Sequence, residues 1–89
     1  MSDTPPDISR LDALTRSRKT LQQAMRLFHA MPSTQARTAV ELAMEACQRA
    51  DLLWPNSEAN RADLVRQWTD AWLAAHVAVY KIIKHRRQN

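Results

Sequence analysis

Four side chains of this sequence could act as ligands for a transition metal: His29, Cys47, His76 and His85. Zinc sites usually take such ligands from local pairs, either two cysteines in a C-x-x-C motif or two histidines on successive turns of a helix. No two of these four residues have either spacing. We therefore expect no metal site.

Two further groups are candidates for catalysis. Cys47 would need a base and a lowered pKa to act as a nucleophile, and its place in an alanine-rich segment favours packing instead. Glu41 and Glu45 lie one turn apart, but both fall on the polar side of their segment, where exposure to solvent accounts for them. The sequence also contains no glycine, which removes the loops that cradle nucleotide phosphates. We expect neither catalysis nor a cofactor.

Large aromatic and basic side chains point instead to binding. Trp68 and Trp72 lie one turn apart, so both indoles belong to the same helix face. Core packing is the first interpretation, and a partner interface is the second, because Trp, Tyr and Arg dominate binding hot spots. Arg18 interrupts the apolar row of its segment. It either extends to solvent from the edge of the core or pairs with an acidic group of a partner.

The chain is basic, with a formal net charge of +4. Its basic residues gather at the C-terminal end, where no acid offsets Lys81, Lys84, Arg86 and Arg87. Such a segment suits nucleic acid or an acidic protein surface. It also complements the negative end of a helix macrodipole.

Helices must position these groups, because a chain without glycine is poorly suited to tight hairpin turns. Apolar residues recur at helical spacing in three segments, and the second segment is rich enough in alanine to be the central helix. The residues that cap or break these segments are Ser9, Pro32, Ser33 or Thr34, Pro55, and Asn56 or Ser57. The sequence predicts an all-α, three-helix antiparallel bundle in one domain over 8–89, after a disordered leader over 1–7, with helices over 9–31, 34–54 and 57–86.

The third predicted helix is longer than the other two. At 1.5 Å per residue it spans about 45 Å, against roughly 30 to 35 Å for each of the others. We expect its last turns to extend past the bundle and to expose Val79, Tyr80, Ile82 and Ile83 to water. Exposed apolar clusters usually mark an interface, so we expect a homodimer that completes the bundle.

These features favour a small regulatory protein that binds and modulates another protein, as an anti-activator, adaptor or chaperone. The candidate interface residues are Trp68, Trp72, Val79, Tyr80, Ile82 and Ile83, and the candidate electrostatic contacts are Arg18, Lys81, Lys84, Arg86 and Arg87. In general shape the predicted molecule resembles the small all-helical bacterial proteins that antagonise transcription regulators or serve secretion systems, which implies a larger protein of that kind as the partner. The alternative is a small basic dimer that binds nucleic acid.

The expected location is the cytoplasm. A single cysteine cannot form an internal disulfide, and the N-terminal residues are acidic rather than basic. The longest apolar run, over 71–75, is far shorter than the roughly 20 residues of a membrane span, so we expect no membrane partner.

Overall fold

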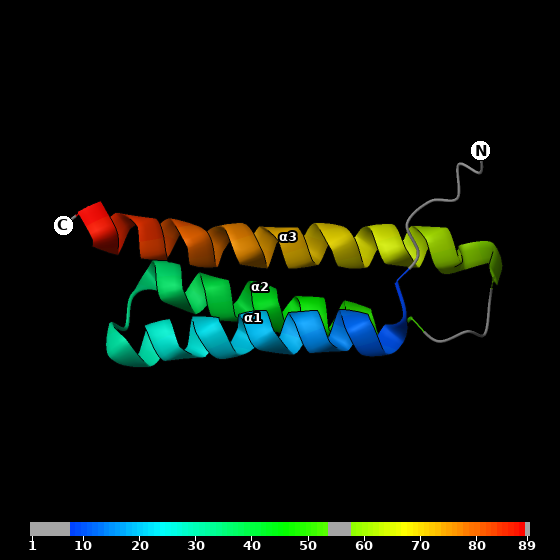
Figure 1. Cartoon of the computed structure of the whole chain (residues 1–89), viewed down its shortest axis with the longest axis horizontal. Coiled ribbons are helices and arrows are strands. Elements are labelled where there is room, and N and C mark those ends of the chain that lie inside the picture. The colour runs from blue at the N-terminus through cyan, green and yellow to red at the C-terminus, as the bar shows by residue number, and fades with distance from the viewer. Residues whose placement is uncertain (1–7, 54–57, 89) are drawn as a thin grey trace.

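The computed structural model describes residues 8–53 and 58–88. They form three helices, α1 (Arg10–Ala30), α2 (Thr34–Asp51) and α3 (Glu58–Gln88). The three helices lie along one long axis, and the chain reverses direction after α1 and again after α2. Helix α2 is therefore antiparallel to both other helices (Figure 1). The predicted all-α architecture of three packed helices is confirmed for the described residues.

Serine side chains fix where the first two helices begin. The Ser9 hydroxyl accepts a hydrogen bond from the Asp12 N–H (3.1 Å), and the Ser33 hydroxyl accepts one from the Ala36 N–H (3.0 Å). Each bond satisfies a backbone donor that the first turn of a helix leaves unpaired. These caps agree with the sequence, and α1 lies within one residue of its predicted range at both ends. The predicted leader over 1–7 and the predicted caps over 54–57 lie outside the described residues.

The predicted end of α2 at residue 54 is wrong. The helix ends at Asp51, and the N–H groups of Leu52 and Leu53 bond to the carbonyls three residues earlier, at 3.2 and 3.1 Å. This tighter turn leads the chain out of α-helical geometry and carries the Leu53 side chain into the core, where it is 1% exposed. Burial of Leu53 beside Trp68 therefore ends the helix earlier than its apolar pattern indicates.

Small side chains allow α1 and α2 to pack closely. The buried residues of α2 are all alanines, at alternating spacings of three and four: Ala36, Ala39, Ala43, Ala46 and Ala50. The buried side chains of α1 are also mostly small: Ala13, Leu14, Ser17, Thr20 and Ala24. Because such residues let helix axes approach, α2 packs extensively against both neighbours, whereas α1 and α3 make fewer contacts with each other. The alanine-rich helix is thus the central one, as predicted.

Two apolar clusters form the core. The first lies near the start of α1 and contains Ala13, Leu14, Ala50, Leu53 and Trp68. The second lies near the α1–α2 turn, where Ala24, Ala39 and Val79 are buried and Leu27, Val40, Ala78, Ile82 and Ile83 pack against them. Beside the first cluster, Arg61 of α3 connects the residues just before α1 and just after α2. Its guanidinium donates to the Ile8 carbonyl at 2.7 Å and to the Leu53 carbonyl at 3.5 Å.

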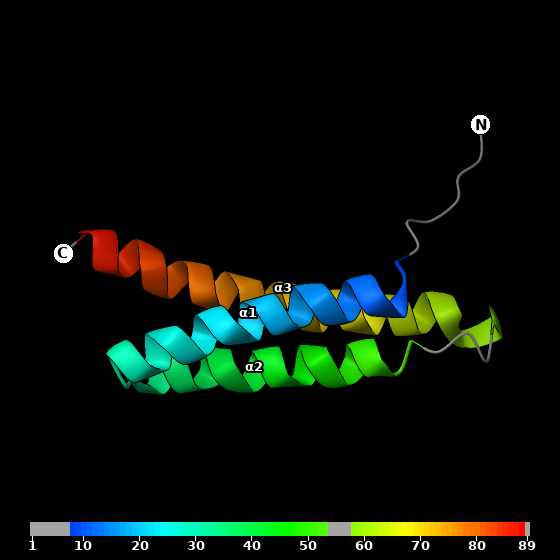
Figure 2. The same ribbon diagram turned by 60° about the horizontal axis from the view of Figure 1, so that its bottom comes forward.

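The 31-residue helix α3 is unbroken and extends beyond the α1–α2 hairpin at both of its ends (Figures 1 and 2). Because the extra length is divided in this way, the hairpin turn lies beside the last third of α3. The expectation that Val79, Ile82 and Ile83 face water is therefore wrong: Val79 is 3% exposed, and the two isoleucines are half-buried in the second cluster. Tyr80 alone of the four expected residues is exposed, at 58%.

Candidate functional site

The two tryptophans of α3 are held by hydroxyl groups of α1. The Trp68 indole Nε1 donates to the Ser17 Oγ at 2.8 Å, and the Trp72 Nε1 donates to the Thr20 Oγ1 at 3.2 Å. The two indoles stack with their ring centroids 5.7 Å apart. Trp68 is buried in the first cluster, so the structure places it in the core of the monomer rather than on an interface. Both polar indole groups have a partner, as buried tryptophans require.

An aromatic row continues from Trp72 toward the surface. The exposed His76 ring stacks on Trp72 with centroids 5.4 Å apart, and the Arg16 guanidinium lies 5.9 Å from the Trp72 ring centroid. Tyr80 follows His76 by one further turn, on the same side of the helix. Trp72 is half-buried at the inner end of this row, and Tyr80 is exposed at its outer end.

Beside this row, α3 presents large apolar side chains to solvent. Leu73 and Val77 are each 45% exposed and Tyr80 is 58% exposed. Their spacings of four and three residues place all three on one side of the helix, and we name this set the α3 stripe. The sequence analysis missed Leu73 and Val77. Their helical spacing is present in the sequence, but spacing alone does not show that this side of the helix faces solvent.

Two opposite charges border the α3 stripe at equal distances. Asp70 precedes Val77 by seven residues and Lys84 follows it by seven, so both lie almost in line with Val77 along the helix. Both side chains are exposed. Within the described part of the chain neither forms a hydrogen bond or an ion pair, since the ion pairs there are Arg10–Asp51, Arg37–Glu41 and Arg49–Glu45.

The candidate catalytic groups lie elsewhere. Burial raises the pKa of the half-buried Cys47 thiol, and the nearby Arg18 charge offsets part of that rise. Arg18 is exposed in the single chain, near enough to Cys47 of α2 for its charge to act on that thiol. Glu41 and Glu45 each pair with an arginine of α2 on the exposed surface. Among the described residues no three His, Cys, Asp or Glu side chains are grouped to hold a metal ion.

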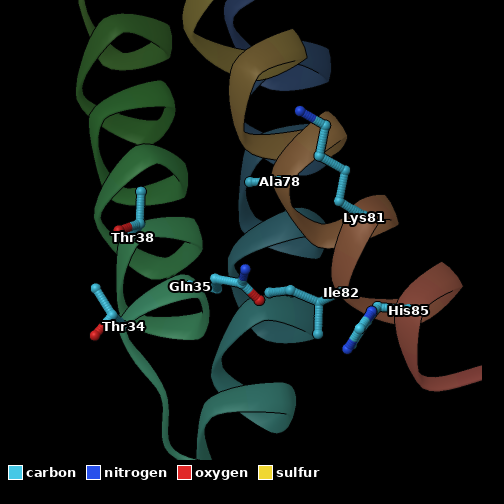
Figure 3. Close-up of a pocket in the computed structure, with 7 residues that line it drawn as sticks. All are labelled: Thr34, Gln35, Thr38, Ala78, Lys81, Ile82 and His85. Atoms are coloured by element: carbon cyan, nitrogen blue, oxygen red, sulfur yellow. The ribbon is translucent and has the colours of Figure 1, made fainter. Parts of the chain in front are cut away.

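The basic end of α3 lies beside the start of α2. Lys81, Lys84, Arg86 and Arg87 are all exposed. A cavity of about 420 Å³ separates Lys81 from α2 and is also lined by Thr34, Gln35, Thr38, Ala78, Ile82 and His85. Figure 3 shows the Lys81 ammonium turned along α3 and away from Thr34, so these polar groups do not converge on one point. The cavity therefore lacks the convergent polar groups of a specific small-molecule site.

None of the helices in the described ranges is long and apolar enough to cross a membrane. Comparison of the chain with protein-family models, with curated proteins and with solved structures found no match.

Proposed function

We propose that this chain is a small regulatory protein that acts by binding an amphipathic helix of another protein on the α3 stripe, without catalysis of its own. The observation that carries the proposal is the exposure of Leu73, Val77 and Tyr80 along the solvent-facing side of a helix whose opposite side packs in the bundle. Contiguous exposed apolar side chains of this kind often mark interaction sites on proteins.

The mode of binding is helix against helix. The partner's apolar side chains would lie between Leu73, Val77 and Tyr80, as in other helix-recognition surfaces. Tyr80 is the main anchor, since its ring offers a large apolar area and its hydroxyl remains hydrated at the rim. His76 and Trp72 extend the surface toward α1, because they continue the aromatic row that ends at Tyr80.

Charge defines the chemistry of the partner helix. It should carry a basic side chain opposite Asp70, an acidic one opposite Lys84 and an apolar row between them, because both charges on α3 lack a partner within the described chain. A helix of a transcription regulator or of a secretion component can supply this pattern. Such a helix would occupy about four turns of α3.

A photo-crosslinking amino acid at position 77, introduced in the cells that make this protein, tests the proposal. Position 62 is the matched control, because Ala62 is exposed on the same helix about 22 Å away from Val77. We expect covalent adducts with another protein from position 77 and none from position 62. Once that protein is identified, Val77→Glu should abolish its co-purification with this chain, while Ala62→Glu should preserve it. Equal labelling from the two positions, or none from either, would reject the docking face.

The second candidate function is nucleic-acid binding through the C-terminal turns of α3. The observation that favours it is the exposure of Lys84, Arg86 and Arg87 on a helix end that extends past the hairpin turn (Figure 2). Such binding depends on phosphate contacts and weakens steeply with salt. A mobility-shift assay with mixed DNA and RNA at low salt separates the candidates. A shift that is lost on replacing the three residues by glutamine supports this function, and no shift at micromolar protein rejects it.

A further inference from the structure

We propose that, when no partner protein is bound, a second copy of this chain covers the α3 stripe, with the two α3 helices antiparallel and related by a two-fold axis at Val77. This inference rests on the proposed role of the stripe as a docking face and adds how that face is regulated. A second copy occupies the face reversibly, and a partner helix must displace it.

The argument starts from the symmetric placement of charge. Asp70 and Lys84 lie seven residues before and after Val77, which is about 10 Å along the helix in each direction. A two-fold axis through Val77, perpendicular to α3, brings Asp70 of each copy against Lys84 of the other. Both charges are exposed and have no partner within the described chain, so the pairing satisfies four charges without breaking an existing bond.

The same charges disfavour the parallel arrangement. Parallel helices in register would place Asp70 against Asp70 and Lys84 against Lys84, and like charges across an interface are unfavourable. A parallel pair would also bring the two basic C-terminal ends together, with Arg86 and Arg87 of each copy on the same side. In the antiparallel pair these ends point in opposite directions.

The apolar side chains fit this arrangement. Val77 is small enough to meet its own copy on the axis, while Leu73 and Tyr80 lie on either side of it by four and three residues. They therefore pack between residues of the opposite helix, as side chains in antiparallel helix pairs do.

The size of the stripe sets the strength of the dimer. Three large apolar side chains per copy on one helix form an interface at or below the lower end of the standard range of about 1,200 Å² in total. We therefore expect a dissociation constant in the micromolar range, on the order of 10 µM. A dimer of this strength yields to a partner helix that binds more tightly.

Sedimentation equilibrium of the full chain, from about 1 µM to about 200 µM, tests the inference. The wild-type mass should rise from that of the 10.2 kDa monomer toward twice that value. Asp70→Lys alone and Lys84→Asp alone should each weaken association about tenfold, because each creates two repulsive pairs across the axis. The double variant with both changes should return to within about threefold of wild type, since it restores both pairs with reversed sign. Both positions are on the surface, so circular dichroism should show the same helical content for the wild type and all three variants.

Disulfide crosslinking at position 77 gives an independent readout of the dimer. In a background with Cys47→Ser, Val77→Cys should form a disulfide-linked dimer under mild oxidation, because a residue on a two-fold axis meets its own copy. Ala62→Cys in the same background is the control and should remain monomeric, since the two copies of position 62 lie about 45 Å apart along the antiparallel helices.

The outcomes separate this inference from the proposed function. A wild-type chain that stays monomeric to the highest concentration, or a double variant that fails to recover, overturns the antiparallel dimer. If position 77 still crosslinks to another protein in that case, the proposed function stands without it. A dimer with the predicted charge dependence, together with no adduct to any other protein, supports the inference and overturns the regulatory binding role.

Discussion

The indole of Trp68 and the hydroxyl of Ser17 form a hydrogen bond of 2.8 Å between α3 and α1, with both side chains almost fully buried. It is one of two such bonds from tryptophans of α3 to hydroxyl groups of α1; the other joins Trp72 and Thr20. Since α1 and α3 contact each other less than either contacts α2, these bonds fix how the long helix lies against the hairpin.

Ser17→Ala should therefore destabilise the chain by about 1–3 kcal/mol, because it leaves a buried indole N–H without a partner. Urea unfolding followed by tryptophan fluorescence measures the change. Thr15→Ala is the control, because among the described residues the exposed Thr15 hydroxyl bonds only to the Leu11 carbonyl within its own helix. A loss below about 0.5 kcal/mol for Ser17→Ala, similar to that of the control, would show that the bond does not orient α3.

The two leucines after α2 form a natural pair for a second test. Leu53 is 1% exposed in the first cluster, whereas Leu52 is 52% exposed. Leu53→Ala should lower the free energy of unfolding by about 2–5 kcal/mol through lost burial and the cavity that it leaves. Leu52→Ala should change it by less than about 1 kcal/mol. Chemical denaturation of both variants decides the point, and equal effects would place Leu53 outside the core.

Close packing of the alanine helix predicts that it does not accept larger side chains. Ala43 is fully buried on α2, so Ala43→Leu should destabilise the bundle by about 1–3 kcal/mol through overpacking, although leucine is a good helix former. Gln48→Leu on the exposed side of the same helix should be nearly neutral. The midpoints of thermal unfolding compare the two variants, and a neutral Ala43→Leu would contradict the close approach of α2 to its neighbours.

The Cys47 thiol predicts a pH dependence of stability. Its pKa is raised by burial above the usual 9.0, so the folded chain keeps this proton at a pH where the unfolded chain has lost it. The thiol's contribution to the free energy of unfolding is fully present below the pKa that it has in the unfolded chain. It is lost as the pH rises through the pKa that it has in the folded chain. Between about pH 8 and about pH 10 the wild type should therefore lose more stability than Cys47→Ala, in which the other titrating groups are unchanged. If stability falls with pH equally in the two proteins, burial does not shift the pKa of the Cys47 thiol.

Local signals in the sequence were sufficient for the three helices and for the starts of α1 and α2. Ser9 and Ser33 cap α1 and α2 through bonds to residues three positions later, and such contacts depend only on neighbouring residues. The end of α2 was not predictable in this way. It is set by the burial of Leu53 against Trp68, a residue of another helix.

The position of α3 along the hairpin explains the errors in the candidate site. Helical periodicity shows which residues share a side of a helix, but it carries no information on how far one helix slides past its neighbours. Val79 was therefore expected in an overhang, whereas the turn between α1 and α2 reaches far enough to bury it. For a related reason, Leu73 and Val77 are absent from the interface residues that the sequence predicts. Which side of α3 faces solvent depends on where α1 and α2 lie, and only the structure places them (Figure 1).

The most direct test of the account is the accessibility of position 77 in the producing cell. Val77→Cys and Ala62→Cys are prepared as two separate variants in a Cys47→Ser background. The thiol of each variant is alkylated with a membrane-permeant maleimide, once in cells and once in dilute purified protein. We predict that the thiol at position 77 reacts at least about tenfold more slowly in cells than in dilute solution, because a helix covers it there, while the thiol at position 62 reacts at similar rates in both. Equal rates for position 77 in the two settings would mean that the α3 stripe stays open to water, which contradicts its role as a docking face.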